Sequence, residues 1–346
     1  MIRLVAVIFV IILLVPKVNA VSYGTPPVSS DLNNVADVKT ESFSEGFLLI
    51  LQDALPLIQP AFYQAVRICV VFIATAILIS IVQNIRGGND HIIQLVGALA
   101  VSTVLLKSSE TFIRLATDTI TKISEYGKLL LPVMTAALAA EGGVNQSTVL
   151  YTGTVAFHTV LSTAISVVIV PIVYVFLCIS TAYCAIGETM LGKIKDFLKW
   201  LATWLLKTIL YAFTGYIGIT GVISGTADAT ALKVTKIAIS NAVPVVGGIL
   251  SNASETVLVS AAMAKNAAGV YGLLAFVSIF IGPFLQTGTQ YLLLKLTGAI
   301  CGVFGSKQMV DILKDFSSAR GLLLALIGTV SLMMMISTVC FMKGTA

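Results

Sequence analysis

The chain has 346 residues, of which 57% are hydrophobic and 11% are charged, and its mean hydropathy is +0.99. A soluble domain carries about a quarter charged residues, so this chain lacks the polar side chains needed to cover a soluble surface. The composition predicts a polytopic membrane protein and excludes a secreted globular enzyme and a disordered regulator. A formal net charge of +5 is too small and too dispersed to indicate a nucleic-acid partner, so we expect the lipid bilayer to be its main surroundings.

The first 20 residues have the three parts of a secretory signal peptide. Arg3 gives a short basic start, residues 4–15 are apolar, and the next five residues end on the small Ala20. This apolar stretch is too short to cross a bilayer, which takes about 20 residues. We therefore predict a signal peptide at 1–20 with cleavage after Ala20, and an uncleaved anchor is the alternative. Residues 21–45 are polar and predict an extracytoplasmic tail.

The membrane part begins with residues 46–90, where we expect an interfacial helix, interrupted by two prolines, and then a first span at 66–85. Residues 92–106 form a second, short apolar stretch. Longer apolar stretches at 201–224 and 322–342 predict two further spans, the second of them close to the C-terminus. Trp200 and Trp204 lie at the start of the span at 201–224, at positions typical of an aromatic belt.

Residues 107–128 predict an amphipathic helix. Apolar side chains recur at helical spacing on one side, and charged side chains lie largely off that stripe. We expect such a helix to lie on the membrane surface or to pack on another subunit. The apolar stripe comprises Phe112, Leu115, Thr119, Ile120, Ile123 and Tyr126, and the charged residues are Glu110, Arg114, Asp118, Lys122 and Glu125.

Two apolar stretches have lengths that do not match a single span. Residues 129–140 contain Pro132 and are short, which predicts a re-entrant half-helix. Residues 148–186 contain His158 and Pro171, and two readings are open for them. They form either two full spans or a returning half-helix followed by one span.

The order of features in the membrane part recurs, which predicts two repeats at 91–200 and 201–320, followed by a final span and the C-terminus at 321–346. Internal repeats with broken helices are typical of transporters. A duplicated scaffold that moves no solute is the alternative. The matched features are Pro132 with Pro244, Pro171 with Pro283, and Lys195-Asp196-Phe197 with Lys314-Asp315-Phe316, and the two prolines of each repeat are 39 residues apart.

The predicted fold is therefore all-α, with about six transmembrane helices, re-entrant half-helices, two repeats of parallel orientation and amphipathic interfacial helices. With the mature N-terminus outside, six spans place the loops at 86–91, 187–200 and 303–320 in the cytoplasm and return the C-terminus to the outside. Lysines and arginines occur on both sides, so the positive-inside rule does not decide this topology.

No motif predicts an enzyme, a metal site or a cofactor, and the five cysteines match buried small hydrophobic residues. Ionisable groups at membrane depth are costly and are therefore functional candidates. We expect His158 to be a hydrogen-bonded bundle residue, and Gln286 and Gln290 to bond between helices. The candidate transport or assembly residues are Asp228, Asn241, Pro244, Gly247, Gly248, Asn252, Glu255, Lys265 and Asn266, with His158, Pro132, Pro171 and Pro283.

Residues 224–269 resemble the stage III sporulation protein AE family. The resemblance lies in Ser224-Gly225-Thr226-Ala227-Asp228, Lys233-Val234-Thr235-Lys236, Pro244-Val245-Val246-Gly247-Gly248, Ser254-Glu255-Thr256-Val257-Leu258 and Lys265-Asn266-Ala267-Ala268-Gly269. The order of signal peptide, polar lead, spans, this segment and a last span is also similar to that family, although the polar lead is short.

The resemblance implies a role in endospore formation, in the mother-cell-derived outer forespore membrane. It implies a permease-like component of the channel or secretion-like complex between mother cell and forespore. Its partners would be other membrane and extracytoplasmic subunits of the SpoIIIA–SpoIIQ-type complex, with a homo-oligomer as a further expectation. The alternatives are an independent secondary transporter of a small solute and a non-conducting membrane scaffold.

Overall fold

A computed structural model describes residues 43–86, 91–242, 247–304 and 307–343, and all of its regular elements in these ranges are helices. The predicted signal peptide at 1–20 and most of the predicted tail at 21–45 lie outside the described residues. The helices are α3 (Phe43–Arg86), α4 (His91–Ala140), α5 (Val144–Thr163), the π-helical η1 (Ala164–Ile169), α6 (Val170–Ile186), α7 (Thr189–Ala242), α8 (Gly247–Phe304) and α9 (Lys307–Lys343).

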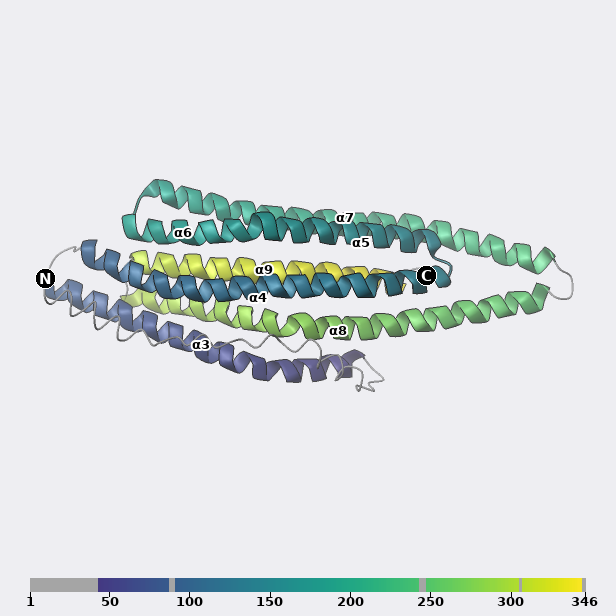
Figure 1. The fold of residues 1–346 in the computed structure, drawn as a ribbon, viewed down its shortest axis with the longest axis horizontal. Coiled ribbons are helices and arrows are strands. Elements are labelled where there is room, and N and C mark those ends of the chain that lie inside the picture. The colour runs from purple at the N-terminus through teal and green to yellow at the C-terminus, as the bar shows by residue number, and fades with distance from the viewer. Residues whose placement is uncertain (1–42, 87–90, 243–246, 305–306, 344–346) are drawn as a thin grey trace.

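The helices form an up-and-down bundle of long rods (Figure 1). α5, η1 and α6 follow one another without a break and act as one rod. α9 lies in the middle and packs against α4, α6, α7 and α8, whereas α3 lies at the side and packs mainly against α8. The core along α9 includes Leu323, Ile327, Val330 and Met333, each at most 2% exposed.

The rods are much longer than a bilayer is thick. α8 has 58 residues and α7 has 54, so at about 1.5 Å per residue each exceeds the roughly 30 Å of a hydrocarbon core. Figure 1 shows the hairpin of α7 and α8 extending beyond the ends of the other helices. A rod of this length that crosses a bilayer must therefore extend well beyond it.

Among the described residues, four helical segments are long and apolar enough to cross a membrane. They overlap four of the six predicted spans. The short stretch at 92–106 and the stretch at 201–224 are not among them, so the predicted number of six stays a prediction. The four segments are Gly46–Thr75, Val144–Ile186, Asn266–Val303 and Val310–Lys343.

Two predicted helix breaks are absent from the structure. α4 runs unbroken through Pro132, so residues 129–140 are not a separate half-helix. Pro132 is exposed, while Leu131 and Met134 beside it are buried, so core packing offsets the roughly 3 kcal/mol that a proline costs inside a helix. Residues 144–186 are likewise one rod, not a hairpin or a half-helix followed by a span. Its irregularity is η1, whose wider turn comes just before Pro171.

The direction of the helices agrees with the predicted grouping of the loops. The C-terminal ends of α3, α6 and α8 and the N-terminal ends of α4, α7 and α9 lie at one end of the bundle (Figure 1). The predicted cytoplasmic loops join these helix ends. The hairpin of α4 with α5–η1–α6 and the hairpin of α7 with α8 run in the same direction. The side of the membrane on which each end lies, and the two repeats, stay predictions.

The amphipathic helix is confirmed, but its partner differs from the prediction. Phe112 and Ile123 of α4 are fully buried, while Glu110, Arg114 and Asp118 are exposed. The apolar face packs inside this chain's own bundle, because α4 contacts α8 and α9. Sequence periodicity gives the apolar side of a helix but not the element that covers it.

Candidate functional site

Most of the predicted site residues lie in the hairpin of α7 and α8. Their backbone is helical, but their side chains lie outside the described part of the structure, and Pro244 lies outside the described residues altogether. Asn266, at the edge of this region, is exposed. The role predicted for this cluster therefore stays a prediction. The residues concerned are Asp228, Asn241, Gly247, Gly248, Asn252, Glu255 and Lys265.

The other four predicted residues do not meet in one place. Pro132 lies in α4, Pro171 in the first turn of α6, and Pro283 in α8, where it is buried. His158 lies in α5, and its buried Nε2 atom has no hydrogen-bond partner among the described residues. The hydrogen bond that we predicted for His158 is therefore not observed.

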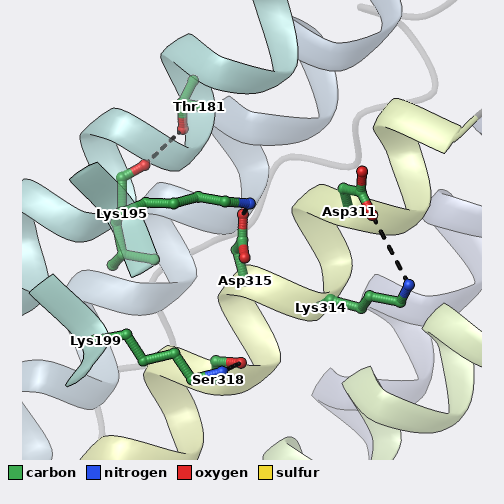
Figure 2. A network of polar contacts seen from close by, with 8 residues as sticks. Thr181, Lys195, Lys199, Asp311, Lys314, Asp315 and Ser318 are labelled. Carbon is green, nitrogen blue, oxygen red and sulfur yellow. Dashed lines mark hydrogen bonds and ion pairs between the residues drawn. The ribbon is translucent and has the colours of Figure 1, made fainter. Parts of the chain in front are cut away.

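The two Lys-Asp-Phe segments lie side by side near the starts of α7 and α9. Lys195 Nζ lies 2.6 Å from Asp315 Oδ2, and four residues further along α7 Lys199 Nζ donates to Ser318 Oγ at 2.9 Å (Figure 2). The Lys195 ammonium also lies 4.4 Å from the centre of the Tyr183 ring, which adds a cation–π contact from α6. This ion pair therefore joins three rods.

Burial separates this ion pair from the other one in Figure 2. The side chains of Lys195 and Asp315 are 10% and 14% exposed. Lys314 and Asp311 lie 3.8 Å apart on one face of α9, and the Lys314 side chain is 69% exposed. Exposed pairs contribute about 0–1 kcal/mol, whereas the loss of one partner of a buried pair costs about 3–5 kcal/mol. Of the two ion pairs in Figure 2, only Lys195–Asp315 is therefore expected to contribute strongly to the stability of the bundle.

A fully buried arginine lies further along α9. The Arg320 side chain is 1% exposed, its Nη2 donates to Ser108 Oγ of α4 at 2.9 Å, and its guanidinium lies 4.1 Å from the centre of the Phe112 ring. The predicted cytoplasmic loop at 303–320 ends at Arg320, and this prediction is wrong for Arg320, which lies buried within α9. A buried arginine is costly unless it is paired and hydrogen-bonded, so its contacts fix how α4 and α9 lie against each other.

Polar side chains also join α3 to α8. Gln290 Nε2 donates to the Ala61 carbonyl at 3.2 Å, and Thr297 Oγ1 lies 2.6 Å from Cys69 Sγ. The interhelical hydrogen bond predicted for Gln290 is confirmed. The buried Gln286 Oε1 atom has no hydrogen-bond partner among the described residues, so the bond predicted for Gln286 is not observed.

The outer face of α4 carries charges of alternating sign, and we call it the charged face of α4. Arg114 Nε and Nη2 both donate to Glu110 Oε1, at 3.2 and 2.9 Å, and the two side chains are 74% and 52% exposed. Six of the seven residues are exposed and Lys122 is half-buried. In chain order the charged face comprises Lys107, Glu110, Arg114, Asp118, Lys122, Glu125 and Lys128.

The described residues contain neither a metal-binding cluster nor a disulfide. No cluster of three or more histidine, cysteine or acidic side chains there has the geometry to hold a metal ion. The five cysteines are free thiols. Nothing in the sequence pattern indicates Arg320 as a core residue. The Lys-Asp-Phe triplet was interpreted as part of a repeat, and its recurrence is the signal that could have indicated the ion pair.

Comparison with known proteins gives one family. The model of the stage III sporulation protein AE family matches residues 33–344. The stage III sporulation protein AE of Bacillus subtilis (strain 168) is 23% identical over 232 residues. That alignment covers 67% of this chain and 58% of the relative, so the chain matches little more than half the length of that protein. No solved structure matches the chain.

Proposed function

The chain belongs to the stage III sporulation protein AE family, and we propose that it is the permease-like integral membrane component of the complex that links mother cell and forespore during endospore formation. The match over residues 33–344 carries this proposal, because it includes every described helix. Family membership and the four apolar helical segments make the chain a sporulation membrane protein. Its part in a channel complex is the proposed step.

In this proposal the protein lies in the mother-cell-derived outer forespore membrane and binds other membrane and extracytoplasmic subunits. The hairpin of α7 and α8 is the element suited to the extracytoplasmic contacts. It extends beyond the ends of the other helices, at the end of the bundle for which we predict the extracytoplasmic side (Figure 1). It also carries the candidate residues Asp228, Asn241, Glu255 and Lys265.

Complementation tests the proposal. The full chain is expressed in Bacillus subtilis lacking its own stage III sporulation protein AE, and heat-resistant spores are counted. We expect the chain to restore spore formation and to co-purify with membrane and extracytoplasmic subunits. A chain that accumulates in the membrane but neither restores spores nor co-purifies with any subunit would contradict the proposal.

Two substitutions separate transport from assembly. Glu255→Gln and Lys265→Met remove charge from the hairpin, and Lys314→Met, at an exposed position of α9, is the matched control. If the hairpin binds subunits, the two hairpin variants lose co-purification and spores together. If these residues act in transport, spores are lost while the complex stays assembled.

A further inference from the structure

The charged face of α4 lies at the depth of the apolar helical segments. The Arg320 guanidinium contacts Phe112, and a Cβ at Gly127 would lie 3.5 Å from the Met334 sulfur. Residues 112–127 of α4 thus run beside residues 320–334 of α9. On the other side, Tyr126 Oη donates to the Gly272 carbonyl of α8 at 2.8 Å.

Residues 321–342 of α9 contain no aspartate, glutamate, lysine or arginine, whereas residues 307–320 contain several. A bilayer core takes about 20 helical residues, so the uncharged stretch marks the position of the core on α9. By the contacts above, residues 112–127 of α4 lie at the same depth. Most of the charged face therefore lies inside the membrane and on the outside of the bundle.

Direct contact between lipid hydrocarbon and the charged face of α4 is energetically unfavourable. A charged residue at the centre of a membrane helix costs about 2.5–3.5 kcal/mol on insertion scales. Pairing along the helix, as between Arg114 and Glu110, returns only about 0.2–0.5 kcal/mol per pair. With charges of alternating sign from Lys107 to Lys128, along about six helical turns, the cost of facing hydrocarbon exceeds what such pairing offsets.

We propose that the charged face of α4 lines a water-filled passage through the membrane, enclosed by copies of this chain. Water is favoured over a partner helix because it can solvate charges of both signs along the whole face, whereas the one ion pair described on the face, Arg114 with Glu110, involves two of its seven charged residues. Copies are favoured because four basic and three acidic residues nearly cancel, so several such faces meet around a passage without large repulsion. A lining with both signs suits small hydrophilic solutes of either charge.

The inference deepens the proposed function by assigning the passage to α4. It rests on the membrane-embedded role and not on the sporulation role, so the two are tested separately. The test below uses the full chain in membrane vesicles, whereas complementation uses sporulating cells. If complementation fails, the passage along α4 is still tested by cysteine accessibility. If the accessibility test fails, the sporulation role is still tested by complementation.

Cysteine accessibility tests the passage. In a chain freed of its native cysteines, single cysteines replace Glu110, Arg114, Asp118 and Glu125 on the charged face. The controls are Val160→Cys and Val167→Cys, at apolar positions that are 55% and 67% exposed. Thr154 Oγ1 lies 3.3 Å from Ser337 Oγ, which places these controls beside the same stretch of α9.

The probes are two membrane-impermeant methanethiosulfonate reagents, one positive and one negative. We expect the charged-face cysteines to react about tenfold or more faster than the controls with both reagents, because only a hydrated thiol ionises readily to the reactive thiolate. Glu188→Cys, in the exposed turn between α6 and α7, confirms that the reagents reach the protein in each preparation. Native-gel or light-scattering measurement of the purified protein is expected to give an oligomer.

Three results would overturn the proposal. Equal reactivity of the charged face and the controls would place this depth outside the bilayer core. An unreactive charged face in a preparation that labels at Glu188→Cys would show that another protein surface covers it. A reactive face in a strictly monomeric protein would show that copies of this chain do not enclose the passage.

Discussion

Lys195 of α7 and Asp315 of α9 form a nearly buried ion pair, 2.6 Å long, between two segments that share the sequence Lys-Asp-Phe. The lysine of the first segment binds the aspartate of the second. One helical turn further on, Lys199 and Ser318 also touch. The recurrence in the sequence thus corresponds to a contact in space, at the end of the bundle where the loops predicted to be cytoplasmic join the helices.

Loss of either partner of this pair should destabilise the bundle. Lys195→Met leaves Asp315 buried without its cation, and Asp315→Asn leaves the lysine without its anion, so each should lower the free energy of unfolding by about 3–5 kcal/mol. Lys195→Met/Asp315→Leu, which removes both charges, should cost less than either single change. Thermal unfolding of the detergent-solubilised protein, followed by circular dichroism, measures the difference.

The matched control for this pair is Lys314→Met. Its side chain is 69% exposed, and its 3.8 Å contact with Asp311 lies on one helix face, so the substitution should change stability by less than about 1 kcal/mol. If Lys195→Met and Lys314→Met lower the free energy of unfolding equally, the Lys195–Asp315 pair stabilises the bundle no more than an exposed pair does.

Substitution of Arg320 should destabilise the protein, even when the new residue is lysine. Its guanidinium stacks on Phe112 and donates to Ser108, and a lysine has neither the planar group nor the same reach, so Arg320→Lys should lose stability and Arg320→Leu should lose more. Ser108→Ala removes one charge-assisted hydrogen bond and should cost about 1.5–3 kcal/mol. Retention of the wild-type melting temperature by Arg320→Lys would refute a role for the planar guanidinium.

Sequence reasoning succeeded where the pattern is local. The burial of Phe112 and Ile123 and the exposure of Glu110 follow from helical periodicity in α4 alone. The decisive information there lies within a few turns of one helix. Trp200 and Trp204 are exposed and their rings stack 6.1 Å apart, and the aromatic belt to which we assign them stays a prediction.

Sequence reasoning failed where distant packing decides. Pro132 signalled a break, but the buried residues around it keep α4 continuous. Arg320 lies among polar residues in the sequence and was placed in a loop, yet Ser108, 212 positions away, holds it in the core. The length of an apolar run also does not show how far a helix continues beyond the bilayer, which is why 148–186 gave two wrong alternatives.

Gly153 should be sensitive to the smallest enlargement. A Cβ at Gly153 would overlap the ring of Tyr216, which also donates to the Val149 carbonyl at 3.1 Å. Gly153→Ala should therefore cost about 1–3 kcal/mol by overpacking between α5 and α7. Gly215→Ala on α7, where nothing lies within 4 Å of the new methyl group, should be neutral or stabilise by up to about 1 kcal/mol.

The melting temperatures of Gly153→Ala and Gly215→Ala, measured under identical conditions, test this prediction. Tyr216→Leu in the Gly153→Ala background should return part of the loss, because the smaller side chain makes room for the methyl group. If Gly153→Ala is as stable as Gly215→Ala, α5 and α7 do not approach as closely as the structure describes.

Thr297→Cys should form a disulfide with Cys69. Thr297 Oγ1 lies 2.6 Å from Cys69 Sγ, so a sulfur at the same position lies within easy reach of the native thiol. The other four cysteines are replaced first, and a protease site is inserted between α3 and α4. After mild oxidation and cleavage, we expect the two fragments to remain linked on a non-reducing gel and to separate on reduction.

The control for this cross-link is Lys295→Cys, two residues away on an exposed part of α8, which should leave the fragments separate. The link would establish that α3 docks on α8 in the membrane, because α3 is the least enclosed of the described candidate spans and makes few other contacts. Efficient linking of Lys295→Cys, or none of Thr297→Cys, would instead show that α3 docks on another face or on another subunit.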